Sequence, residues 1–239
     1  MTPQLNEIWV YLSASPLLGL TITLLAYQAA FWLYRRSGLN PLVNPVLVAV
    51  TILVLLLTLT GTSYETYFAG AQFVHFLLGP ATVALAIPLF LQFRRVRSML
   101  LPVAAGLLAG SLTAALSAIA IARLFGASLP TQLSLAPKSV TTPIAMGIAE
   151  RIGGIPSLTA VLVIVTGILG AVSGRYVLDA IKVRDPAIRG FAIGVAAHGI
   201  GTARAFQVSE QAGAFAALAM GLNGALTALL LPLLVGWMR

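Results

Sequence analysis

The segment SLAPKSVTTPIAMGIAERIGG, residues 134–154, decides how this sequence is interpreted. It contains a lysine, a Thr-Thr-Pro run and a Glu-Arg pair, and it lies between two long apolar stretches. Ionisable groups in such surroundings are costly to expose to lipid, so they face a protein interior or a water-filled cavity and mark functional sites. The segment therefore predicts a site inside a membrane-embedded protein.

The composition supports the bilayer as the solvent of this chain. Of its 239 residues, 59% are hydrophobic and 8% are charged, and the mean hydropathy is +0.98. A soluble domain carries about 25% charged residues. The apolar runs are long and lack the alternation of barrel strands, so we expect an all-α polytopic membrane protein. The net charge of +8 lies in short basic clusters at the ends of apolar runs, which is typical of cytoplasmic loops rather than of a nucleic-acid surface.

About six transmembrane helices are predicted. Their approximate ranges are 16–34, 45–60, 73–93, 100–124, 158–178 and a last run that ends at Trp237. The third run is interrupted by Gly79-Pro80, and the polar stretch GTSYETYFAGAQ (61–72) precedes it on the outer side. We expect residues 1–97 to form a scaffold and dimerisation domain and residues 98–239 to form a transport domain.

The basic clusters also predict how the two polar segments cross the membrane. Cytoplasmic placement of residues 35–36, 94–97 and 182–189 puts the amino terminus outside. Residues 134–154 must then enter the membrane and return to the outer side, and residues 193–213 must do the same from the inner side. The sequence thus predicts two re-entrant, discontinuous helical hairpins of opposite orientation.

An internal repeat supports this topology. A shift of 60 residues aligns Thr142 with Thr202, Ala145 with Ala205, Glu150 with Glu210 and Gly153 with Gly213. Each copy contains one crossing and one hairpin, so the two copies would be inverted. Inverted repeats that meet at the bilayer midplane are typical of secondary transporters.

Each hairpin is predicted to present a helix amino terminus to the membrane interior. Thr142 precedes Pro143, which suits the first helical turn, so Thr142 is the expected N-cap. Thr202 takes the same place after a bend at residues 199–201. Free N–H groups and the positive dipole end make such termini anion sites, and Arg204, on the first turn after the Thr202 cap, can form two parallel hydrogen bonds to a carboxylate.

Several ionisable residues accompany the helix ends. Lys138 and His198 enter the two breaks at equivalent positions, and Lys138 is predicted to bind the anion. His198 either titrates near neutral pH or is a packed histidine that hydrogen-bonds a carbonyl. Glu150 and Glu210 either carry a proton or cation or form ion pairs with Arg151 and other cations.

The motifs of common enzymes are missing. The sequence has no HExxH, GxSxG or P-loop motif and no intramembrane aspartate pair. Two histidines, at 75 and 198, and no cysteine make a metal site improbable. We therefore expect no enzyme, no catalytic residue, no metal and no cofactor.

The segment 134–171, together with LLGPATVALAIPL (77–89) and AAHGIGTARAFQVSEQAGAFAALAMGLNG (196–224), resembles the LrgB/CidB family of membrane proteins. The resemblance runs from about residue 45 to the carboxyl end and extends to the membrane domain of the plastidal glycolate/glycerate translocator. The family was long described as antiholin-like or as a murein hydrolase exporter, and later as transporting small monocarboxylates. The resemblance implies a bacterial inner membrane location and a holin-like membrane partner of the LrgA/CidA type.

Carried over by position, the family signature falls on ten residues. They are Lys138, Ser139, Thr141, Thr142 and Pro143 in the first copy and His198, Gly199, Gly201, Thr202 and Arg204 in the second. The chain departs from the family pattern at Ala197, Gln207 and Ala216, where serine, glutamate and serine are common. The substitution at Gln207 leaves the coupling ion open.

The sequence thus predicts a secondary transporter of pyruvate, glycolate, glycerate or lactate, with or without proton coupling. The hairpin-bearing half would move against the first spans, as in an elevator mechanism, and the chain is expected to form a homodimer. Two alternatives remain: an antiholin-like regulator that acts with a holin-like partner, and a passive anion channel.

Overall fold

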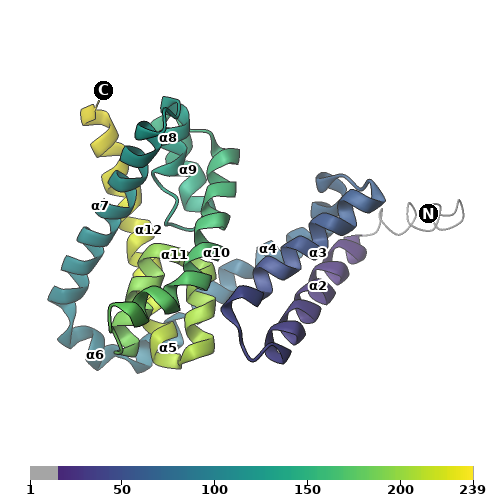
Figure 1. Ribbon diagram of the computed structural model, residues 1–239, viewed down its shortest axis with the longest axis horizontal. Coiled ribbons are helices and arrows are strands. Elements are labelled where there is room, and N and C mark those ends of the chain that lie inside the picture. The colour runs from purple at the N-terminus through teal and green to yellow at the C-terminus, as the bar shows by residue number, and fades with distance from the viewer. Residues whose placement is uncertain (1–15, 239) are drawn as a thin grey trace, which may run out of the picture. The chain divides into compact units, whose positions relative to one another are not determined.

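The structure is a computed structural model that describes residues 16–238, without the side chains of residues 16, 75, 78, 79, 81, 82, 237 and 238. The described part of the chain contains helices only, which agrees with the predicted all-α class. Its elements are α2 (Pro16–Arg36), the 3₁₀ helix η1 (Pro41–Val43), α3 (Pro45–Thr60), α4 (Tyr64–Ala84), α5 (Ala86–Leu91), α6 (Phe93–Ser98), α7 (Leu100–Leu124), α8 (Leu129–Leu135), α9 (Thr142–Ile152), α10 (Pro156–Ala180), α11 (Pro186–Val208) and α12 (Glu210–Met238) (Figure 1).

Among the described residues, four helices are long and apolar enough to cross a membrane. They are Leu17–Arg36, Leu100–Leu124, Pro156–Ala180 and Glu210–Gly236, and α3 is a shorter apolar helix of 16 residues. An uninterrupted crossing needs about 20 residues at 1.5 Å each. The chain is therefore a multi-pass membrane protein.

The chain divides into two compact units, one up to Ala84 and one from Leu85 onward. In unit 1, α2 packs against both α3 and α4. The contact with α4 is close at Gly19, where an added Cβ would lie 2.5 Å from the Tyr67 carbonyl oxygen. The different roles predicted for residues 1–97 and 98–239 stay a prediction.

Local signals explain why α3 has its predicted limits. The Asn44 side chain accepts hydrogen bonds from the amides of Val46 and Leu47, and Pro45 occupies the first helical position. Gly61 ends the helix in the left-handed region, at φ 64°. An N-cap asparagine before proline and a glycine after the last turn are strong boundary signals.

The predicted third span, 73–93, is wrong in both of its limits. Helix α4 already begins at Tyr64, because Ser63 lies at its start and Glu65 in its first turn favours the positive end of the helix dipole. Pro80 lies inside α4 without ending it. The chain instead breaks at Leu85 and Gln92, which separate α4, α5 and α6.

In unit 2, helix α11 folds back on itself. Its first half runs parallel to α12, since Gly190 contacts the backbone of Ala212 and Gly194 that of Ala216. Its second half runs antiparallel to α12, since Thr202 contacts Met220 and Phe206 packs on Gly213. Both ends of α11 therefore lie at the same end of α12.

The segment between α7 and α10 also turns back. Helix α8 has seven residues and α9 has eleven, which gives lengths of about 10 and 17 Å, well short of a bilayer core. In Figure 1 both lie at the end of unit 2 that carries the carboxyl terminus, whereas α5 and α6 lie at the opposite end. The Ser134 hydroxyl accepts from the amide of Ile155 at 2.8 Å, and the Thr159 hydroxyl donates to the Ser134 carbonyl, so α8 is fixed to the start of α10.

Candidate functional site

The first break is a six-residue turn between α8 and α9, at residues 136–141. Helix α9 begins at Thr142, and Thr141 is its N-cap, with φ −64° and ψ 147° and no side-chain capping bond. The prediction that Thr142 is the N-cap is therefore wrong by one residue. Pro143 takes the second helical position, where its missing N–H is also harmless because the first N–H groups of a helix have no intrahelical partner.

The second break is a single residue, His198. Its backbone has φ 40° and ψ −134°, whereas the residues on both sides are helical. A non-glycine residue at positive φ is strained and persists only where its surroundings hold it. The predicted bend at residues 199–201 is thus displaced to His198. Thr202 is not a cap, since it lies inside the second half and its hydroxyl donates to the His198 carbonyl at 2.7 Å.

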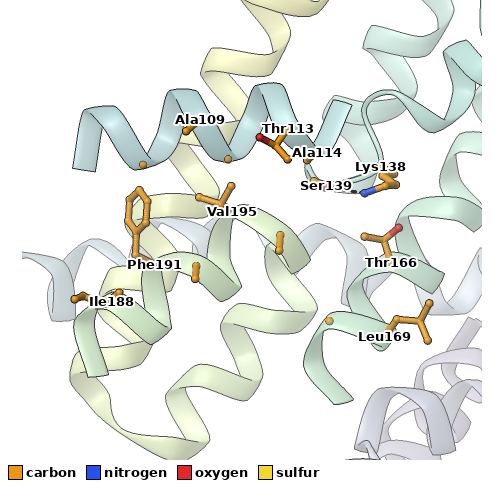
Figure 2. Close-up of a pocket in the computed structure, with 15 residues that line it drawn as sticks. Ala109, Thr113, Ala114, Lys138, Ser139, Thr166, Leu169, Ile188, Phe191 and Val195 are labelled. Carbon is orange, nitrogen blue, oxygen red and sulfur yellow. Dashed lines mark hydrogen bonds between the residues drawn. The ribbon is translucent and has the colours of Figure 1, made fainter. Parts of the chain in front are cut away.

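A cavity of about 770 Å³ lies between α7, the first break, α10 and the first half of α11. Figure 2 shows Ile188 and Phe191 at one end of it and Lys138 at the other. Ile188 lies in the first turn of α11, within the basic cluster of residues 182–189. The cavity therefore extends from the basic end of unit 2 toward the turn that carries Lys138.

Lys138 is the charged residue among those that line this cavity. Its Nζ lies 3.4 Å from the hydroxyl oxygen of Ser139, the other site residue of the first copy that lines the cavity. Thr113 and Thr166 add two hydroxyl groups near it, and the remaining walls are glycine and apolar side chains (Figure 2). No aspartate or glutamate lines the cavity, and none of the ion pairs among the described residues involves Lys138.

His198, the counterpart of Lys138, has the opposite environment. Its side chain is 3% exposed, and its Nε2 lies 2.9 Å from the Val163 carbonyl oxygen. The ring packs against Gly167 of α10, where an added Cβ would lie 2.6 Å from Cε1. Of the two interpretations open for His198, the structure describes the packed histidine that bonds a carbonyl.

The other predicted site residues lie away from the cavity. Arg204 donates from Nη1 to the Gln207 side-chain oxygen at 3.3 Å. Glu150, Arg151 and Glu210 are exposed, and the ion pairs found among the described residues do not include them. Of the other second-copy residues, Gly201 and Thr202 are buried and Gly199 is partly buried. The structure thus brings Lys138 and Ser139 together at the cavity but leaves Arg204 outside its lining.

Sequence reasoning missed Asn223, which joins the two breaks. Its side-chain nitrogen donates to the carbonyls of Ser139, at 3.2 Å, and Val195, at 3.1 Å. Its oxygen accepts from the Ser111 hydroxyl. A lone asparagine in a long apolar run was the available signal, since polar side chains in membrane helices commonly bond across helices.

A comparison with known families matches residues 23–237 of the chain to the LrgB-like family. The chain belongs to the LrgB-like family. The predicted resemblance is thereby confirmed, and it covers both discontinuous segments and Asn223.

Relatives match along nearly their whole length. The chain is 36% identical over 222 residues to "Uncharacterized protein YwbG" of Bacillus subtilis, which covers 93% of this chain and 98% of that protein. It is also 36% identical over 214 residues to "Uncharacterized protein YxaC" of the same organism, covering 90% and 93%. "Antiholin-like protein LrgB" of Bacillus cereus is 29% identical over 219 residues, covering 92% and 95%. No solved structure matches the chain.

Proposed function

We propose that this LrgB-like membrane protein is a secondary transporter of small monocarboxylates of the pyruvate, glycolate, glycerate or lactate class. The observation that carries the proposal is the Lys138 ammonium group, which lies at the end of the cavity opposite Ile188 and Phe191. No acidic residue lines this cavity. An ammonium group in a largely apolar cavity attracts an anion strongly, because little water screens it.

The lining favours a small acid with one charge. Lys138 supplies one positive charge, and the hydroxyls of Ser139, Thr113 and Thr166 are placed to bond a carboxylate oxygen or a 2-keto or 2-hydroxy group. Val195 and Phe191 offer apolar contact to a short carbon chain. A second carboxylate would lack a matching cation in this lining, which disfavours dicarboxylates.

The folded-back segments support a carrier with an inverted repeat. We propose six crossings, formed by α2, α3, α4, α7, α10 and α12, and two re-entrant hairpins, formed by α8–α9 and by α11. The repeat finds support in two contacts made by Val163 and Asn223, which are 60 positions apart and each of which contacts the break of the other copy. The Val163 carbonyl contacts His198 in the second break, and Asn223 contacts Ser139 in the first.

In this proposal the amino-terminal ends of α9 and of the second half of α11 supply N–H groups to the anion during transport. Arg204 would reach the substrate only in a state other than the one described. Residues 1–97 would act as the scaffold and dimer contact, and the hairpin-bearing part would move against them. Glu150, Arg151 and Glu210 are the candidates for ion coupling.

A second candidate function follows from the name of the Bacillus cereus relative, "Antiholin-like protein LrgB". On that reading the chain regulates a holin-like membrane partner of the LrgA/CidA type and binds no substrate. Lys138→Gln would then change assembly with the partner, and the wild-type chain itself would show no transport. A passive anion channel differs from both, because its flux does not saturate and shows no counterflow.

The test is uptake of labelled pyruvate and glycolate by proteoliposomes that contain the purified chain, with and without an inward proton gradient. We expect saturable uptake and counterflow, which Lys138→Gln lowers at least about tenfold, as for the loss of a charged hydrogen bond. Lys182→Gln, in the exposed basic loop, is the matched control and should retain uptake. Arg204→Ala tests the second-copy cation. Saturable uptake that survives Lys138→Gln would contradict the site, and no uptake with or without the holin-like partner would contradict the function.

A further inference from the structure

Asn223 is a buried polar side chain of unit 2 with hydrogen-bond partners for all of its polar groups. It lies near the middle of α12 and is 1% exposed. Its two N–H groups donate to two carbonyls, and its oxygen accepts from Ser111 and, at 3.4 Å, from Thr227. A carboxamide has two donors and an acceptor with two lone pairs, so its whole hydrogen-bonding capacity is used.

One carbonyl lies in the first break, and the other lies in the helical turn just before the second break. Ser139 follows Lys138 in the first break, and its carbonyl lies outside any helix. Val195 lies three residues before His198, so an α-helical bond to its carbonyl would have to span the non-helical residue. In a bilayer an unpaired carbonyl costs several kcal/mol, so such groups require a donor from elsewhere.

Both residues that carry these carbonyls also line the cavity. Ser139 and Val195 are among its lining residues, and Ser111 lies on α7, which forms the opposite wall. A single side chain on α12 therefore fixes the spacing between the Lys138 turn, the first half of α11 and α7. The carboxamide lies outside the lining of the cavity.

We infer that Asn223 is a positioning residue that couples the two breaks, so that the Lys138 turn and the α11 break keep one relative placement. The inference rests on the proposed function only for its effect on substrate, since the coupling itself is a property of the fold. The coupling also explains why the residue at position 223 is an asparagine. An aspartate of the same size keeps the bond from Ser111 but, when ionised, donates to neither carbonyl.

The first test needs no substrate. Hydrogen–deuterium exchange of the detergent-solubilised chain is measured by peptide for wild type, Asn223→Asp and Thr227→Val. We expect Asn223→Asp to speed exchange at least about tenfold in both 136–145 and 193–201, with α10 and unit 1 unchanged. Thr227→Val is the matched control, because it removes only the 3.4 Å contact on the same helix. Faster exchange in only one break, or equally throughout unit 2, would overturn the inference.

The second test uses pyruvate uptake as a function of pH. For Asn223→Asp we expect the KM for pyruvate to rise about tenfold at pH 7.5 and to recover partly at acidic pH, where the protonated carboxyl can donate to one carbonyl again. The recovery is measured as the ratio of the variant KM to the wild-type KM at each pH, and this ratio should stay near one for Thr227→Val. A variant with unchanged KM, or with lost uptake at every pH despite a normal exchange pattern, would overturn the role of Asn223 at the site.

A variant that fails to fold leaves the inference testable through Ser111→Ala. That substitution removes one bond to the Asn223 oxygen and touches neither break. We expect it to speed hydrogen–deuterium exchange in the same two segments, by about threefold. No change at either break would contradict the coupling. If wild type takes up no pyruvate, the proposed function fails, and the exchange experiment still decides whether Asn223 couples the breaks.

Discussion

The two discontinuous segments of unit 2 turn back by different means. The first uses a six-residue turn between two separate short helices, and it places Lys138 at a cavity. The second keeps one helix and breaks it at a single strained residue, whose imidazole is buried against α10. Equivalent positions of the repeat thus hold a cation that faces a cavity in one copy and a packed ring in the other. In the described state, both copies contribute to the cavity wall, but only Lys138 of this pair of ionisable residues faces it.

The largest expected effect separates the two segments by how closely a glycine of each packs on a neighbouring helix, which is α12 for Gly194 and α8 for Gly154. Gly194→Val would drive its side chain into the Ala216 backbone, so we expect a loss of about 3 kcal/mol or more of stability. At Gly154, where the first copy makes its close contact, an added Cβ meets backbone atoms of residues 133 and 134 at 3.0–3.2 Å. Gly154→Ala should therefore cost clearly less.

Thermal unfolding in detergent measures both changes. Gly221→Ala is the control, because a Cβ there meets nothing within 4 Å and alanine favours a helix. Equal losses at positions 194 and 154 would mean that the two segments are packed alike.

The second effect contrasts His198 with Lys138 directly. His198→Ala removes a buried ring and its bond to the Val163 carbonyl, so we expect about 2–3 kcal/mol of destabilisation. Lys138→Ala removes a charge from the cavity wall and should change stability by under about 1 kcal/mol. Melting curves of both variants, with pyruvate uptake of the folded protein, test this. A Lys138→Ala variant that unfolds as readily as His198→Ala would contradict the contrast.

A smaller effect concerns the strained backbone of the second break. The Thr202 hydroxyl donates to the His198 carbonyl, so Thr202→Val should cost about 1 kcal/mol. Thr202→Ser keeps the hydroxyl and serves as the matched control. Both variants are compared by urea or thermal unfolding. Equal stability of Thr202→Val and Thr202→Ser would mean that this bond does not hold His198 in place.

The smallest effect lies outside the membrane segments, at the cap of α11. Burial alone would raise the pKa of the Asp185 carboxyl, but hydrogen bonds from the amides of Ile188 and Ala187 and the Arg95 guanidinium, 2.6 Å away, lower that pKa. A lowered pKa stabilises the fold at any pH above the ordinary value near 4, and that contribution disappears as the pH falls through the lowered value.

We therefore expect the melting temperature of wild type to fall below about pH 4 more steeply than that of Asp185→Asn. The difference should be under about 1 kcal/mol, because the ion pair is more than a third exposed and is screened. The first copy has no such acidic cap at α8, where Ser128 takes the N-cap position without a capping bond. If the melting temperatures of wild type and Asp185→Asn fall equally with pH, the lowered pKa of the Asp185 carboxyl does not contribute to stability.

Boundary signals explain which helices could be predicted from the sequence. The limits of α3 and α7 match the predicted 45–60 and 100–124, because each apolar run is flanked by polar, glycine or basic residues. The start of α4 was missed because SYETY is polar, although serine and glutamate there favour a helix amino terminus. Composition alone does not separate a polar loop from a polar first turn.

The site was only partly predictable. Lys138 and Ser139 stood out because they interrupt an apolar sequence, and both line the cavity. The break at His198 was placed on the nearby glycines, because glycine is the usual residue at positive φ, whereas tertiary packing on Gly167 holds the histidine there. Asn223 requires the fold, since its partners Ser139, Val195 and Ser111 are far from it in sequence.

The most direct test of the account is substrate protection inside the cavity. The chain has no cysteine, so Ala114→Cys places a single thiol on the cavity wall and leaves every proposed substrate-binding side chain in place. The rate of its reaction with a small water-soluble maleimide is measured with and without pyruvate, and again after adding Lys138→Gln. We predict that saturating pyruvate slows the reaction and that Lys138→Gln abolishes this protection while the thiol stays reactive. A reactive thiol that pyruvate does not protect, or protection that persists without the lysine, would contradict a carboxylate site at Lys138.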